Sequence, residues 1–178
     1  MSNFKIVLHS LAISFLLVAA DAYSACTSTI TNSANVSSQF TSSAANQCLI
    51  NTGVITIPND YGIVTGYINS NISNSGTILT SASGGGFYIG GSGNTSLTIS
   101  NSGTISASDA GNIVYAIWVL NNVGTIQEIN NSGLISVTNA AQAAGVAIYD
   151  GNIVRNLINS GTVNVGSSGY AGLWVNGG

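Results

Sequence analysis

The chain has 178 residues and a formal net charge of −3 at pH 7; 45% of its residues are hydrophobic, but only 4% are charged. Soluble domains usually carry about 25% charged residues, so Asn, Ser, Thr and Gly must supply most of this protein's surface. Lys5 and Arg155 are the only Lys or Arg residues, which excludes the basic footprint that binds nucleic acid or an anionic membrane surface.

The first 22 residues have the layout of a secretory signal peptide. Lys5 provides a positive start, and a mostly apolar run follows from Ile6 to Ala20. Ala20-Asp21-Ala22 then matches the A-x-A pattern of a cleavage site. The apolar run is shorter than the roughly 20 residues of a membrane-spanning helix. We therefore expect residues 1–22 to form a cleaved signal helix that directs export through the inner membrane.

The only two cysteines, Cys26 and Cys48, lie in the next part of the chain. In an exported protein such a pair favours a disulfide, which would contribute roughly 3 kcal/mol in the chain-entropy model. A metal or redox site has too few partners, because there is no C-x-x-C motif and the only histidine lies in the signal segment. Lipid attachment at Cys26 is the alternative, although Tyr23 fits that cleavage motif poorly. We predict a small, disulfide-closed N-terminal cap at residues 23–48.

One short phrase then recurs five times. An Asn-Ser-Gly or Asn-Thr-Gly corner lies between aliphatic or β-branched residues, and its glycine falls at Gly53, Gly76, Gly103, Gly133 and Gly161. Self-similarity at a period between about 20 and 50 residues is the mark of a solenoid. Asn and Gly tolerate the left-handed backbone of a sharp turn. Each phrase therefore predicts a strand, a tight turn and a second strand.

Two further strand-like pieces accompany most corners, so that one coil holds about three short strands. The first set covers residues 62–64, 86–89, 116–119, 147–149 and 172–175, and the second covers 96–99, 125–129 and 153–157. The pattern predicts an all-β parallel β-helix of about five coils over residues 49–178, stacked about 4.8 Å apart. The chain would then stop within a coil without a polar cap, as expected of a fragment or a truncated product.

Inside such a stack, residues at equivalent corners would superpose. Ile78, Ile105, Ile135 and Val163 would form an aliphatic column. The corner residues would form a second, structural column, made of Asn74, Asn101, Asn131 and Asn159 with Gly76, Gly103, Gly133 and Gly161. The asparagines would bond side chain to side chain, as identical amides do in cross-β assemblies. The alternative, of equal weight, is that they only shape the turns and face water.

Aromatic residues recur two positions after Gly86, Ala116, Ala147 and Gly172. They are Tyr88, Trp118, Tyr149 and Trp174. Strand alternation places them on the face opposite Phe87, Ile117, Ile148 and Leu173. This second set is the more consistently apolar, which favours an outward aromatic column that would bind a glycan or a partner surface. The alternative is that the rings point inward and fill the core.

The part of the chain after the signal segment has no His and no Lys, which excludes Ser-His-Asp and Cys-His nucleophiles, histidine zinc sites and lysine bases. The remaining enzymatic hypothesis is glycan cleavage by two carboxylates about 5 to 9.5 Å apart. Asp109 and Asp150 are its candidates, because each precedes a Gly-Asn-Ile-Val phrase. Asp109 precedes a strand whereas Asp150 follows one, so solvated loop acids are the favoured interpretation. We predict no catalytic site, no metal site and no cofactor.

The signal segment, the Cys-containing cap, the repeated I-x-N-S-G-T-I phrase and the A-I-Y/W-V strands together resemble passenger segments of bacterial autotransporters and related β-helical surface adhesins. The resemblance covers about residues 49–178. It implies a cell-surface or extracellular, outer-membrane-associated location. It also implies two partners with no counterpart in this sequence, further downstream coils and a C-terminal translocator β-barrel.

Three functional hypotheses remain. The favoured one is a non-enzymatic, secreted or cell-surface passenger region that acts as an adhesin or a structural stalk, with a glycan or a host surface as its ligand. The second is a glycan-active β-helix that uses Asp109 and Asp150. The third is a spacer that binds nothing.

Overall fold

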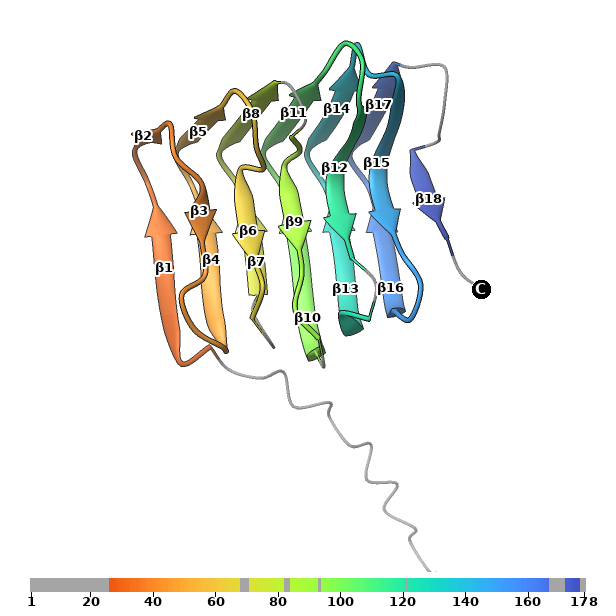
Figure 1. Ribbon diagram of the computed structural model, residues 1–178. Helices are drawn as coiled ribbons and strands as arrows, with labels where there is room; N and C mark the ends of the chain where they lie inside the picture. Colours follow the sequence, from red (N-terminus) through yellow and green to blue (C-terminus); the bar gives the residue numbers. More distant parts are fainter. Residues whose placement is uncertain are drawn as a thin grey trace, which may run out of the picture.

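The computed structural model describes residues 26–67, 71–81, 84–92, 94–120, 122–166 and 172–176. The expected signal peptide, residues 1–22, lies outside the described residues. Within the described ranges every regular element is a β-strand, and none of these ranges holds a helix able to span a membrane. The strands form a row of coils, with the first coil at one end and the last at the other (Figure 1).

The described residues form eighteen strands in three sheets, and each sheet takes one strand from every coil. Sheet A contains β1 (Ser28–Asn32), β4 (Gln47–Asn51), β7 (Asn71–Asn74), β10 (Asn94–Asn101), β13 (Gly124–Asn131) and β16 (Ile153–Asn159). Sheet B contains β2 (Asn35–Val36), β5 (Val54–Ile57), β8 (Thr77–Ser81), β11 (Thr104–Ser108), β14 (Leu134–Thr138) and β17 (Thr162–Gly166). Sheet C contains β3 (Phe40–Thr41), β6 (Ile63–Thr65), β9 (Phe87–Ile89), β12 (Ile113–Val119), β15 (Gln142–Ile148) and β18 (Leu173–Val175).

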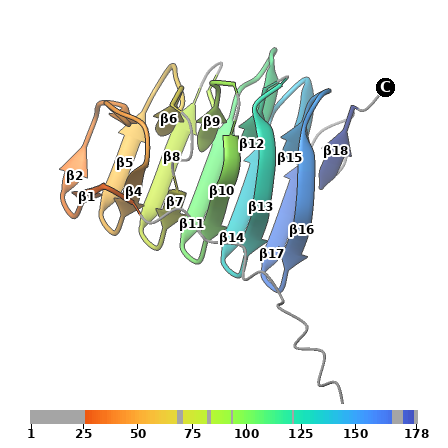
Figure 2. The ribbon, with the colours of Figure 1, turned by 90° about the horizontal axis from the view of Figure 1, so that it is seen from below.

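All strand pairs within these sheets are parallel, so the chain returns to the same sheet once per turn. Figure 2 shows the result from below, with β10, β13 and β16 side by side and β11, β14 and β17 side by side. From β1 to β16 the chain makes about five turns. The predicted all-β parallel β-helix is confirmed.

The repeats begin one coil earlier than the sequence indicates. The expected cap at residues 23–48 already contributes β1, β2 and β3 to the three sheets, and Asn32 pairs in register with Asn51. Ala34 takes the place of the corner glycine in this first coil, because its carbonyl accepts the Val54 N–H just as Gly53 accepts that of Thr77. A search for Asn-Ser-Gly therefore misses the coil.

The predicted disulfide joins Cys26 to Cys48, with 5.5 Å between the two Cα atoms. Cys48 lies in β4, where it pairs with Thr29 of β1. Cys26 precedes β1 and also accepts a 3.5 Å hydrogen bond at Sγ from Nδ2 of Asn71. The bridge thus fastens the start of the first coil to the second.

Inward-facing aliphatic side chains stack into columns that form one continuous core. The predicted column is confirmed and extends by one member to Ile55, which pairs with Ile78. Ile55, Ile78, Ile105 and Ile135 are 0% exposed, and Val163 packs against the same core. Burying each such side chain contributes about 1.5 to 3 kcal/mol. The coils therefore stabilise one another through their nearest neighbours.

A ladder of asparagine side chains runs along the corner between sheets A and B. Each Nδ2 donates to Oδ1 of the next asparagine at 2.7 to 2.8 Å, through Asn32, Asn51, Asn74, Asn101, Asn131 and Asn159. From Asn51 onward, the same Nδ2 atoms also approach a carbonyl two residues ahead, as Asn101 does at Gly103 (3.4 Å). Asn51, Asn74, Asn101 and Asn131 are buried. The ladder hypothesis is confirmed, with two members more than the sequence analysis named.

The corner glycines serve close packing rather than a left-handed turn. None of them has a positive φ; among non-glycine residues, positive φ occurs instead at Asn46, Asn122 and Asn139. A Cβ on Gly103 would lie within 3.0 Å of the Gly76 carbonyl oxygen, closer than Cβ atoms approach other atoms. The same holds at the other four corner glycines, each against the corner of the preceding coil. The expectation of left-handed corners is therefore wrong, because the approach of the neighbouring backbone selects glycine.

Replacing Asn101 with Ala would leave Nδ2 of Asn74 without its side-chain acceptor and Oδ1 of Asn131 without its donor. Because these atoms are buried, we expect the free energy of unfolding to fall by about 1 to 3 kcal/mol. Urea titration followed by circular dichroism measures the change. Asn164→Ala, at an exposed position of β17, is the control and should change stability by less than about 0.5 kcal/mol. Equal losses in both variants would contradict a stabilising ladder.

A second prediction concerns the close approach at the corner. Gly103→Ala should lower the unfolding free energy by about 1 to 3 kcal/mol or more, because the new Cβ forces two coils apart. Gly111→Ala is the matched control, since nothing lies within 4 Å of a Cβ built there. Thermal melts of both variants test this, and a stable Gly103→Ala protein would refute the steric requirement.

Candidate functional site

The outer face of sheet C carries the predicted aromatic residues. Phe87, Ile117 and Ile148 are 0 to 4% exposed and belong to the inner core. Tyr88 and Trp118 alternate with them and are half-buried on the opposite face. Tyr149 and Trp174 are also half-buried and pack outside the core, against Ala144 and Ala147. The outward orientation favoured by the sequence is confirmed.

The four aromatic residues do not form a single column, which corrects the predicted register. Trp118 pairs with Tyr88 on one side and with Ala147 on the other, and Ala147 pairs with Trp174. Tyr149 therefore lies two residues beyond the expected position.

The strands pair through a different pair of small residues than the phrases suggest. Gly145 stands two residues before Ala147, as Ala116 stands two residues before Trp118, and a Cβ on Gly145 would come within 3.0 Å of the Val163 side chain and of the Gly172 carbonyl oxygen. The sequence similarity between Ala116-Ile117-Trp118 and Ala147-Ile148-Tyr149 is thus out of register with the pairing of β12 and β15. The strand pairing, and not the resemblance of the phrases, decides which residues lie side by side.

Six rings form a continuous layer on this face, which we call the aromatic layer. Its members are Tyr61, Tyr88, Tyr115, Trp118, Tyr149 and Trp174. The ring centroids of neighbouring members lie 4.9 to 6.2 Å apart. Tilted and edge-to-face contacts predominate, whereas Tyr115 and Trp174 are stacked with an interplanar angle of 15°. Such pairs contribute about 0.5 to 1.5 kcal/mol each beyond their burial.

Small residues make room for the layer. A Cβ on Gly85 would come within 3.0 Å of the Tyr61 ring and of the Tyr115 carbonyl oxygen. Ala144 and Ala147 are 0% exposed beneath the rings. The sequence analysis missed Tyr61 and Tyr115 because it followed one position per coil. The signal that could have found them is the alternation of large and small residues, as in the pairing of Tyr115 with Ala144.

The polar atoms of the layer are held among the rings. The hydroxyl groups of Tyr115 and Tyr149 lie 3.0 Å apart and share a hydrogen bond. Nε1 of Trp118 is buried and makes no hydrogen bond within the described part of the chain. Burial raises the pKa of Tyr61 well above its usual 10.0, and Tyr88, Asp60 and Tyr149 raise it further. The layer is therefore a packed apolar surface whose half-buried rings present partial faces and edges outward.

The two carboxylates of the enzymatic hypothesis are not brought together. Asp109 lies before β12, where its Oδ2 accepts a 2.7 Å hydrogen bond from Asn112. Asp150 follows β15, which runs parallel to β12, so the two acids lie at opposite ends of sheet C. Seven residues of β12 separate these ends by roughly 20 Å. This exceeds the about 5 to 9.5 Å that a carboxylate pair needs. Among the described residues no three His, Cys, Asp or Glu side chains gather as a metal site either.

No protein-family model, no curated protein and no solved structure matches this chain. The aromatic layer is the candidate site, because it gathers large apolar side chains on the outside of a sheet.

The Tyr61 phenol provides a pH-dependent test of the layer. In the folded state its pKa lies above that of the unfolded chain, so above about pH 10 the unfolded state binds fewer protons. The unfolding free energy should therefore be fully retained below about pH 10 and fall as the pH rises further. Tyr61→Phe should flatten this decline in urea titrations across that range. Tyr67→Phe, at a tyrosine that is 43% exposed, is the control, and an identical decline in both variants would contradict a buried Tyr61.

Proposed function

We propose that this chain is a non-enzymatic, β-helical passenger region of an exported protein, which acts as a stalk with an adhesive face. The signal-like first 22 residues support export to the cell surface or the medium. The near absence of charge fits a solenoid whose contacts are backbone ladders, amide ladders and apolar columns. The downstream coils implied by the repeat family would lengthen the same stalk.

A stalk must keep its shape under load, and the described coils are cross-connected along their whole length. Six strands per sheet, spaced about 4.8 Å apart, give a stack on the order of 25 Å tall. The disulfide at Cys26 and Cys48 fastens one end. The strand pairs and the asparagine ladder then connect each described coil to the next.

The observation that carries the adhesive role is the aromatic layer. A soluble scaffold gains its core stability from inward residues, yet here six rings cover the outer face of one sheet. Flat rings with half-buried faces suit the apolar faces of sugar rings or an apolar patch of a partner. We therefore assign the layer as the binding surface and carbohydrate as its ligand class.

The test is an array of immobilised neutral oligosaccharides probed with the chain and its variants. We expect Tyr88→Ala and Trp174→Ala to weaken binding by roughly fivefold to tenfold, as the loss of about 1 kcal/mol of ring contact implies. Leu79→Ala is the matched control, because Leu79 is 40% exposed on β8 of sheet B. Circular dichroism establishes that each variant remains folded.

Two outcomes would contradict the adhesive role. Binding that both ring variants retain at full strength would place the ligand elsewhere on the molecule. A folded chain that binds no oligosaccharide would favour the spacer hypothesis, in which the layer only shields sheet C.

A further inference from the structure

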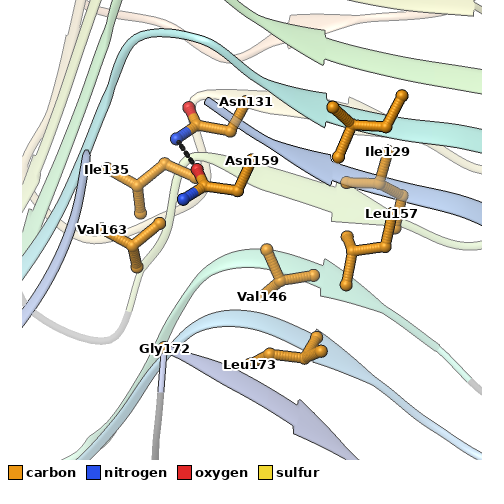
Figure 3. A pocket seen from close by; sticks show the side chains of 10 residues that line it. Ile129, Asn131, Ile135, Val146, Leu157, Asn159, Val163, Gly172 and Leu173 are labelled. Carbon is orange, nitrogen blue, oxygen red and sulfur yellow. Dashed lines mark hydrogen bonds between the residues drawn. The ribbon is translucent and has the colours of Figure 1, made fainter. Parts of the chain in front are cut away.

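The first and the last described coil differ in their corner hydrogen bonds and in the exposure of their core side chains. At the C-terminal end, β16, β17 and β18 are the last strands of their sheets among the described residues. Leu157 and Leu173 are each 42% exposed there. With Ile135, Val146 and Val163 they point into a hollow of about 300 Å³ between the last two coils (Figure 3). In the described structure, core side chains therefore line the last coil of the stack.

The asparagine ladder has a polarity that ends in a donor on this face. Nδ2 of Asn131 reaches Oδ1 of Asn159 at 2.7 Å and the Thr162 carbonyl at 3.4 Å, both in the next coil. Nδ2 of Asn159 keeps only the contact within its own coil, to the Gly161 carbonyl at 3.3 Å, which Asn131 also makes to Gly133. In the described structure it thus lacks the two inter-coil acceptors that the preceding asparagine has.

At the N-terminal end, the corner N–H finds its hydrogen-bond acceptor within its own coil. In later coils the corner N–H donates to the asparagine carbonyl of the preceding coil, as Gly53 does to Asn32 at 3.1 Å. In the first coil the Ala34 N–H donates instead to Oδ1 of its own Asn32, at 3.3 Å. That Oδ1 is the acceptor that an incoming ladder amide would use.

Ala34 also carries the Cβ that the other corners exclude. At Gly53, Gly76 and the three later corner glycines, a Cβ would lie within 3.0 Å of the carbonyl oxygen below. A coil placed beneath Ala34 with the same spacing would meet that Cβ with its own corner carbonyl. The end strands contain no Pro and only one charged residue, Arg155. The usual devices against edge pairing, charges and prolines, are thus nearly absent.

We propose that Ala34 is a steric stop, which prevents the first coil of one copy from stacking on the last coil of another. The C-terminal face would then accept only a coil that carries glycine at the corner, that is, an Asn-x-Gly coil of the same repeat. Its Asn159 amide would bond to the asparagine of that coil, and its open hollow would be closed by that coil's aliphatic residues. This inference goes beyond the proposed function and does not depend on the aromatic layer.

The experiment removes the stop from the full chain. Ala34→Gly should associate head to tail, and because such a contact does not close into a ring, it should give filaments. Each copy would add about 29 Å to the filament, from six rungs per sheet at about 4.8 Å. Sedimentation velocity and electron microscopy measure mass and axial repeat. Ala34→Ser keeps a Cβ and is the matched control; it should behave like the wild type.

Mixing provides a second readout. Wild-type chain can dock through its C-terminal face but offers a blocked N-terminal face, so small amounts should shorten Ala34→Gly filaments. Adding Asn159→Asp to Ala34→Gly replaces the terminal donor with a carboxylate and should abolish the filaments, whereas Asn164→Asp on the outer side of β17 should not.

Three results would overturn the proposal. One is an Ala34→Gly chain that sediments like Ala34→Ser. Another is filament formation by the wild type at equal concentration. The third is association that Asn164→Asp disrupts as strongly as Asn159→Asp, because this would indicate a lateral contact rather than stacking of the ends.

Discussion

The close approach of successive backbones at the corner between sheets A and B is the constraint on which the rest of this structure depends. The carbonyl of one corner occupies the place where the next corner would have a Cβ. Only this spacing brings each Asn side chain within 2.7 to 2.8 Å of the next. The same spacing aligns the aliphatic columns behind the corner and the strand ladders on both sides. The absence of a Cβ at each corner thus allows the coils to stack at this spacing.

The sequence predicts the solenoid well, because a corner that must contain Asn and Gly leaves a periodic signal that needs no knowledge of partners. The same periodicity suggests the asparagine ladder as one of two equal alternatives, and the single pair of cysteines predicts the disulfide. It fails at the first coil, where Ala34 stands at a corner with no described coil beneath it. It also misjudges why glycine is used, since the φ angles at the corners are ordinary. Packing across coils is not visible in local turn preferences.

The aromatic layer shows the same limit at the candidate site. Which residues face outward follows from strand alternation, and this was predictable. Which outward residues meet depends on the offset between β12 and β15, which pairs Trp118 with Ala147 and not with Tyr149. Tyr61 and Tyr115 become part of the layer because Gly85 and Ala144 leave space for them. Complementary sizes on neighbouring coils are a three-dimensional property, so a search along one position per repeat cannot find them.

Coil length varies widely while the corner stays fixed. Successive ladder asparagines are separated by 19 to 30 residues. The hydrogen bonds between their side-chain amides nevertheless hardly change in length. The additional residues lie in the strands: the three strands between Asn32 and Asn51 have 2, 2 and 5 residues, whereas those between Asn101 and Asn131 have 5, 7 and 8 residues. A solenoid built in this way can broaden along its axis, and so enlarge its lateral faces, while the rungs keep their pitch.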